Sequence, residues 1–198
     1  DLVLGACSHP ERLPAVPRVD TTRAQPLGIA NARFYADEKA NALFRHYVKT
    51  LVGRTSTVTG PLGDPVQADW RYSRGTAVIE MARSSGLTLV GGAKNNDAMA
   101  ASTVGTGELI DQALSLGATK IVVCLGGSAT TDGGLGCIRA ISAPQRLKRV
   151  QLLVACDVQT LFTDAAPVFA PQKGATPAQV DMLRGRLERR TAAGPVAR

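Results

Sequence analysis

The stretch "TKIVVCLGGSATTDGGLGC", residues 119–137, places a short apolar run directly before a loop of glycines and hydroxyl residues. Ile121–Leu125 has no polar alternation, which is typical of a strand covered on both faces, as in a parallel sheet. Open α/β sheets bind ligands just beyond the carboxyl ends of their strands. The stretch therefore predicts an α/β fold with a binding site in this loop.

The rest of the chain alternates between helix-like and strand-like segments. Val150–Cys156 is a second apolar strand, and residues 54–73 predict two strands around a Pro-Gly turn. The residues of "LTLVGG", 87–92, predict a further short strand. Helices are expected at residues 37–52, Thr76–Ser85, Gly107–Leu116 with Thr106 as its cap, and after the capping box of Thr176 and Gln179. This alternation predicts α/β architecture.

The loop has the composition of a phosphate cradle. Gly126 and Gly127 lack side chains, so their N–H groups can approach an anion closely, and Ser128, Thr130 and Thr131 add hydroxyl donors. A helix that follows the loop would aim its N-terminus at the same point. The spacing matches neither a Walker A loop nor the Gly-x-Gly-x-x-Gly pattern of dinucleotide-binding proteins.

Four charged residues fall near this predicted site. Asp132 would be repelled by phosphate unless a cation lay between them, which makes it a candidate Mg²⁺ ligand or general base, with an Asx-turn as the alternative. Asp157 directly follows the strand ending at Cys156. Glu80 is expected on the helix that begins at Thr76, facing either ligand or solvent. The ammonium group of Lys173, in "PQKGAT", is expected either to contact a phosphate or to be solvated.

Composition excludes several other classes of protein. The net charge of +7 could attract nucleic acid, but aromatic residues make up only 4% and do not alternate with basic ones, so we expect no nucleic-acid partner. No apolar run approaches the about 18 residues of a membrane span, so no membrane partner is expected. The first residues lack the basic head and long apolar body of a secretory signal, which favours a cytoplasmic protein. The four cysteines show no CxxC spacing, and we expect buried, reduced thiols.

Several motifs together resemble one family. They are "GPLGDPVQADW" (60–70), "TAVIEMARSSGL" (76–87), "STVGTGELIDQAL" (102–114), "GGSATTDGGLG" (126–136), "ACDV" (155–158) and "PQKGAT" (171–176). In this order they are similar to bacterial glycerate kinases of the two-domain type, over roughly residues 36–190. The resemblance implies two α/β domains, one inserted within the other and only partly represented here. Residues 1–64 would belong to the domain built from the chain ends, and residues 65–198 to the inserted domain.

The resemblance also implies an activity. Such kinases transfer the γ-phosphoryl group of ATP to D-glycerate, usually giving 2-phosphoglycerate, with Mg²⁺, so ATP, Mg²⁺ and glycerate are the expected cofactors and partner. The oligomeric state is left open. Matching positions assign catalysis to Asp132, Asp157 and Lys173, the metal to Asp132, and substrate binding to Glu80. The same match assigns ATP binding to Gly126, Gly127, Ser128, Thr130, Gly133 and Gly134.

The chain also departs from the family pattern. Nothing matches the family's first Ser-Phe-Lys-Gly-like loop, and after Ala36-Asp37 the family's glycine-rich segment is absent. The connection between Ile138 and Val150 is shorter than in the family, and the glycine-rich segments expected after "ACDV" and "PQKGAT" are missing. Two explanations fit. Either the sequence is part of a longer protein, or it is a catalytically degenerate relative that binds a nucleotide or a small acidic metabolite.

Overall fold

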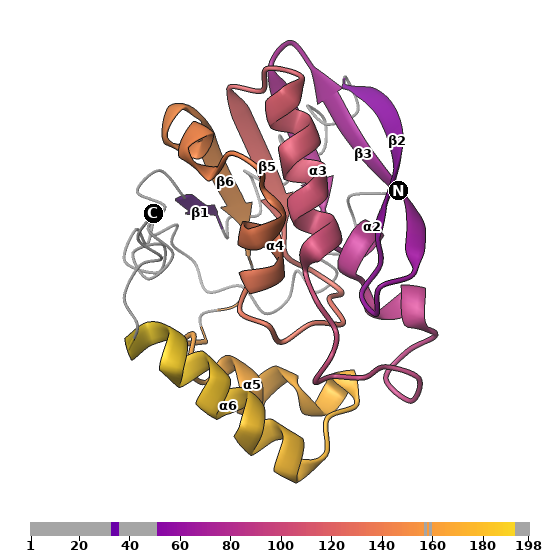
Figure 1. Cartoon of the computed structure of the whole chain (residues 1–198), viewed down its shortest axis with the longest axis vertical. Helices are drawn as coiled ribbons and strands as arrows, with labels where there is room; N and C mark the ends of the chain where they lie inside the picture. The colour runs from indigo at the N-terminus through magenta and orange to yellow at the C-terminus, as the bar shows by residue number, and fades with distance from the viewer. Residues whose placement is uncertain (1–32, 36–50, 157, 159, 193–198) are drawn as a thin grey trace.

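The computed structural model describes residues 33–35, 51–156, 158 and 160–192. These residues form one six-stranded sheet with the order β1-β6-β5-β4-β3-β2 (Figure 1). The first four strands in this order are parallel, and β3 and β2 extend the sheet as an antiparallel hairpin. The strands are β1 (Arg33–Tyr35), β2 (Val52–Thr59), β3 (Pro65–Ser73), β4 (Thr76–Glu80), β5 (Lys120–Cys124) and β6 (Gln151–Ala155). The predicted α/β class is therefore confirmed.

One face of the sheet is covered by two helices, α3 (Val104–Ser115) and α4 (Leu135–Ala140), which lie in front of the strands in Figure 1. The main core forms here, and Ile79, Leu109 and Ile121 are completely buried in it. On the opposite face, Val122 packs in a separate cluster with Val78. Strand β5 thus buries side chains on both faces, as its continuous apolar sequence predicted.

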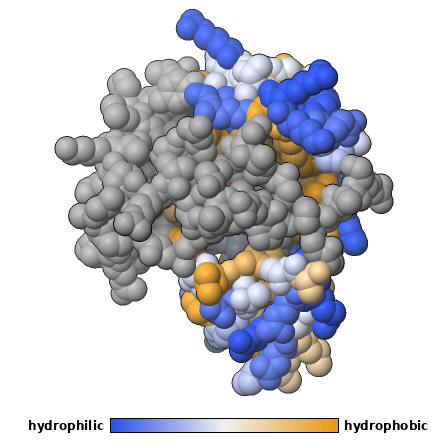
Figure 2. Space-filling view, turned by 90° about the vertical axis from the view of Figure 1, so that its left-hand side faces the viewer, coloured by the Kyte–Doolittle hydropathy of each residue, from blue (hydrophilic) through white to orange (hydrophobic). Residues whose placement is uncertain are grey.

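A smaller layer lies below the carboxyl ends of the parallel strands (Figure 1). It consists of α5 (Ala165–Phe169), the 3-10 turn η5 (Pro171–Lys173) and α6 (Pro177–Ala192). Its own core is built around Leu183 and Leu187, each 1% exposed, with Ala98 and the partly buried Phe162 packed against them. From the side, polar residues and a few exposed apolar ones mix over its surface (Figure 2).

Several local predictions are confirmed. Residues 54–73 form the β2–β3 hairpin, and β5 and β6 lie where the two apolar runs were placed. The capping box also forms, because the Thr176 N–H donates to Gln179 Oε1 at 2.8 Å and the Gln179 N–H donates to Thr176 Oγ1 at 3.4 Å. Among the described residues, no helix combines the length and hydropathy that a bilayer span requires.

The helix predicted at Thr76–Ser85 is wrong. Residues 76–80 form the central strand β4, and only Ala82–Ser85 form a short helix, α2. The first four residues of β4 are all buried between β3 and β5, and this tertiary environment outweighs the helical pattern. The strand predicted from "LTLVGG" is also wrong: Leu87–Val90 form a 3-10 turn, η3, that ends at the left-handed Gly91.

Two further predictions differ in their boundaries. Helix α3 begins at Val104 with Thr103 as its N-cap, so Thr106 is an internal residue and not the cap. The 3-10 turn η4 (Pro144–Arg149) connects α4 to β6. The helix predicted at residues 37–52 lies outside the described residues except at its end, where Val52 begins β2.

The predicted domain boundary, between residues 64 and 65, falls in the turn of the β2–β3 hairpin. These two strands pair along their whole length, from Val52 opposite Tyr72 to Thr59 opposite Pro65. Within the described residues, both sides of the boundary therefore belong to one sheet. The assignment of residues 1–64 to a second domain stays a prediction.

Candidate active site

The carboxyl edge of the parallel strands brings several predicted site residues together. Glu80 pairs with Cys124, and Cys124 pairs with Ala155, so the three strands end at the same level. The glycine loop leaves β5 at this edge. Glu80 is the last residue of a strand and does not lie on the helix expected to carry it. Asp157 would follow β6 here, but it lies outside the described residues.

Glu80 has one partnered and one unpartnered carboxylate oxygen. Its Oε2 accepts a hydrogen bond from Arg83 Nε at 3.2 Å, while Oε1 is buried and has no hydrogen-bond partner. The side chain is only 12% exposed. Burial raises the pKa of Glu80, and the opposing effects of Arg83 and Arg71 are smaller. A buried carboxylate oxygen without a partner is a place where a ligand hydroxyl or a cation can bind.

The first half of the glycine loop, residues 126–129, is held by main-chain bonds to the end of α2 and to the turn after it. The Leu87 N–H donates to Gly127 O at 2.8 Å, and the Ala129 N–H donates to Ser85 O at 2.9 Å. Gly127 adopts a φ of 66°, which favours glycine. Among the described residues, the N–H groups of Gly126 and Gly127 find no acceptor. These two amides can therefore donate to an anion.

A buried hydroxyl cluster joins the end of α2 to helix α3. Thr106 Oγ1 lies 2.9 Å from both Ser84 Oγ and Ser85 Oγ, and Ser84 and Ser85 are completely buried. Because Ser85 also accepts the bond from Ala129, the cluster ties the loop to helix α3.

Asp132 organises the second half of the loop. Its Oδ1 accepts the Gly134 N–H at 3.1 Å, which forms the Asx-turn given above as the alternative. Its Oδ2 accepts the Thr103 N–H at 2.9 Å, the Thr103 hydroxyl at 2.7 Å and the Gly136 N–H at 3.1 Å. An ionised carboxylate offers about four lone-pair sites, so Oδ1 keeps one that could face a cation.

The glycines of the two halves have different surroundings. A Cβ on Gly133 would lie 2.7 Å from the Phe162 ring and 2.9 Å from Leu187, so this glycine allows α6 to pack against the loop. Gly134 is the left-handed N-cap of α4 and donates to Asp132. At the start of α4, Cys137 N–H donates to Thr103 Oγ1 at 2.9 Å. Side chains of the protein thus accept hydrogen bonds from main-chain N–H groups that were expected to face a phosphate. ATP binding by Gly133 and Gly134 stays a prediction.

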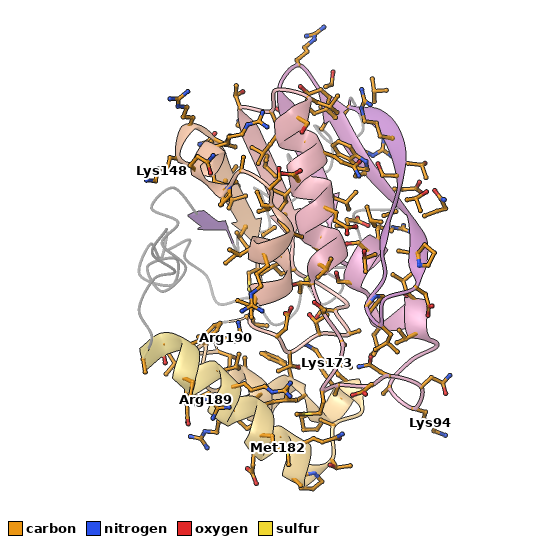
Figure 3. All side chains as sticks on the ribbon, viewed as in Figure 1. Lys94, Lys148, Lys173, Met182, Arg189 and Arg190 are labelled. Atoms are coloured by element: carbon orange, nitrogen blue, oxygen red, sulfur yellow. The ribbon has the colours of Figure 1, made fainter. Side chains whose placement is uncertain are left out.

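Lys173 connects the lower layer to the loop. Its ammonium group donates to the main-chain carbonyl of Thr130 at 2.6 Å, and Figure 3 shows the side chain between the two layers. Burial lowers the pKa of Lys173 to about 8, against the opposing attraction of Asp132. The sequence expectation of a lysine beside the loop is met in position, whereas its contact with phosphate stays a prediction.

Sequence reasoning missed two residues at this junction, Asn96 and Arg190. Asn96 Nδ2 donates to Ala129 O at 3.0 Å and to Lys173 O at 2.8 Å. Arg190 extends from α6 toward the part of the molecule that contains the sheet (Figure 3). Its charge is attracted by Asp132 and repelled by Arg139 and Arg186. A local sequence pattern could not have found either residue, because their partners lie far away in the chain.

The donor set fits a magnesium ion held mostly by phosphate. Among the described residues, no group of three or more His, Cys, Asp or Glu side chains could hold a metal. Mg²⁺ in phosphoryl-transfer sites needs only one or two carboxylates, with water and phosphate as the other ligands. The free lone pair of Asp132 Oδ1 meets that requirement, and the unpartnered Oε1 of Glu80 is a second candidate oxygen.

Comparison with known proteins identifies the family. The family model described as "Glycerate kinase family" matches residues 40–144 and 141–194, and the chain belongs to this family. The resemblance found in the sequence motifs is thereby confirmed. The two matched segments overlap at residues 141–144, within the connection between Ile138 and Val150.

Individual relatives agree with this assignment. The chain is 40% identical to the glycerate kinase of Bacillus subtilis, covering 69% of this chain and 46% of the relative. It is 41% identical to the glycerate 2-kinase of Escherichia coli, covering 68% and 44%. A crystal structure from Salmonella typhimurium LT2 that is assigned as glycerate kinase 2 matches with a TM-score of 0.67 and 35% identity, covering 72% of this chain and 47% of that one. The chain thus spans less than half the length of these relatives.

Proposed function

We propose that this chain carries the ATP-binding part of a kinase that phosphorylates D-glycerate, with 2-phosphoglycerate as the product. The observation that carries the proposal is the free amide pair of Gly126 and Gly127 at the carboxyl edge of a parallel sheet. Phosphoryl transfer depends mainly on positioning and charge stabilisation, and such amides provide both for the phosphates of ATP. Membership of the glycerate kinase family supports the choice of acceptor.

The other site residues have separate proposed roles. Ser128 and Thr130 border the phosphates beside Gly126 and Gly127, and Lys173 contributes positive charge at the same place. Glu80 accepts a hydrogen bond from a hydroxyl of glycerate through its unpartnered Oε1. Asp132 or Asp157 activates the attacking hydroxyl or holds Mg²⁺. When bound, Mg²⁺ neutralises charge on the β- and γ-phosphates.

The test is whether ADP is released only when D-glycerate, ATP and Mg²⁺ are present together. A coupled assay measures ADP, and phosphorus NMR of the product identifies the hydroxyl that is phosphorylated. Omission of D-glycerate is the control for ATP hydrolysis. ADP release that does not depend on D-glycerate would contradict the choice of acceptor.

A catalytically degenerate relative is the second candidate function. It is favoured by the start of α4, where Asp132 and Thr103 occupy the amides of Gly136 and Cys137. Such a protein would be stabilised thermally by ATP or ADP but would form no product. Measurement of the melting temperature with and without nucleotide, beside the ADP assay, separates the two candidates.

A further inference from the structure

Three segments far apart in the chain meet at the side chain of Asn96. Its Nδ2 donates to the carbonyl of Ala129, which ends the first half of the glycine loop, at 3.0 Å. The same nitrogen donates to the carbonyl of Lys173 in η5 at 2.8 Å. One amide group thus joins the loop after β5 to the turn that carries the lysine.

The chemistry of this contact requires a hydrogen-bond donor. Both partners are carbonyl oxygens, so of the two ends of the Asn96 amide only the NH₂ group can face them, and a carboxylate would be repelled by both. This fixes the orientation of the amide and leaves Oδ1 pointing elsewhere, where it is buried and without a partner. The amide therefore keeps its two donor contacts although its own acceptor is unsatisfied.

Neighbouring contacts join the same three segments. The Lys173 side chain bonds back to Thr130 O at 2.6 Å, so Lys173 is joined to the loop through both its side chain and its main chain. Gly174 has a φ of 94°, and a Cβ there would lie 2.2 Å from Ala93 O. The turn of η5 therefore lies directly against the segment that carries Asn96.

We propose that Asn96 is a positioning residue that fixes the glycine loop relative to Lys173, and thereby sets the ATP-binding geometry. The inference rests on the proposed function, since it assigns Asn96 to the same site. Asn96 acts through main-chain carbonyls and touches neither ATP nor glycerate. Because loop and lysine belong to different layers, their relative position depends on such a link.

The experiment compares Asn96→Ala and Asn96→Asp with Asn95→Ala as the matched control. Asp keeps the shape of the side chain but loses the donor, whereas the Asn95 side chain is exposed and donates only a 3.5 Å bond to Gly91 O. Both Asn96 variants should raise the KM for ATP by about tenfold while the KM for D-glycerate changes by less than about twofold. The Asn95 variant should behave as wild type. A role in folding alone would lower the melting temperature without separating the two KM values.

A second measurement makes the inference independent of catalysis. Hydrogen exchange of the peptide covering residues 126–134 should become faster in both Asn96 variants, with little change across α3, residues 104–115. If wild type releases no ADP, the proposed function fails, and the exchange result then decides the inference by itself. If the alanine variant does not fold, the Asp variant decides it. Unchanged exchange and an unchanged KM for ATP in a folded variant would overturn the role of Asn96.

Discussion

The Lys173 ammonium donates a 2.6 Å hydrogen bond to the main-chain carbonyl of Thr130, across the boundary between the sheet and the lower helical layer. A charged lysine held by a neutral carbonyl in a partly buried place is unusual, because burial disfavours the charged form. Asp132 supplies the opposite charge that favours it. The arrangement leaves an ammonium beside the proposed phosphate site, where a phosphate would favour its charged form.

Kinase activity should fall at alkaline pH because Lys173 loses its proton. With a pKa of about 8, the charged fraction drops about tenfold between pH 7 and pH 9, and kcat/KM for ATP should follow it. Lys173→Met should lower kcat/KM at pH 7 and remove this alkaline limb. The exposed Lys94 provides the control, since Lys94→Met should keep the profile of the wild type. An alkaline limb that persists in Lys173→Met would assign it to another group.

The same group should make stability depend on pH in a defined direction. The pKa of Lys173 is lower in the folded state, about 8, than its ordinary value of 10.5, so the unfolded chain binds more protons between these values. The contribution of Lys173 to the unfolding free energy therefore rises as pH increases from 8 to 10.5, and it is lost as pH falls through 8. Urea unfolding of wild type and Lys173→Met across this range measures the difference. A difference that is independent of pH would contradict the lowered pKa.

Asp132→Ala should cost stability as well as activity. The substitution removes the acceptor for three main-chain N–H groups and for the hydroxyls of Thr103 and Ser102, and it should lower the unfolding free energy by about 3 kcal/mol. Asp111 offers a matched control, because it accepts only from the main chain and hydroxyl of Ser142 at an exposed position, and Asp111→Ala should cost less than about 1 kcal/mol. Equal losses in urea unfolding would show that the Asp132 bonds carry little of the stability.

Gly127→Ala should separate backbone strain from phosphate binding. Gly127 and Gly117 have φ values of 66° and 81°. A Cβ added to Gly127 would contact only the Cβ of Ala82, at 3.4 Å, and a Cβ added to Gly117 would have no heavy atom within 4 Å. Alanine at either position should therefore cost about 1–2 kcal/mol of stability through the left-handed backbone. Only Gly127→Ala should also raise the KM for ATP, because Gly117 ends α3 away from the loop. Equal KM values in the two variants would remove the Gly127 amide from the proposed phosphate site.

Glu80→Gln should lower turnover without lowering stability at pH 7. Burial raises the pKa of the Glu80 carboxyl, so the ionised form at pH 7 is disfavoured by folding, and the stability linked to its proton is lost as pH rises through the folded pKa. The neutral amide avoids this cost and should leave the protein at least as stable at pH 7, with turnover lowered about a hundredfold. Thermal unfolding and the ADP assay test the two halves. A stable variant with full turnover would exclude Glu80 from the site.

Local patterns predicted a substantial part of the fold. The apolar runs of β5 and β6, the β2–β3 hairpin and the capping box of Thr176 all depend on residues close together in sequence. The glycine loop and the other motifs were likewise enough to identify the family, since they are read residue by residue. The failure at residues 76–85 has the opposite cause: a short apolar run suits a helix or a central strand, and only its neighbours β3 and β5 decide.

The amino-acid sequence thus determined the α/β class, the family and the place of the glycine loop, because propensity and motif act over a few residues. Only the tertiary structure decided that Glu80 ends a strand, that Asp132 is bound by Thr103, and that Asn96 joins the loop to Lys173. The two partners of the Asn96 amide lie 33 and 77 residues away in the chain. Such contacts arise from the packing of one layer against another, which no short stretch of sequence specifies.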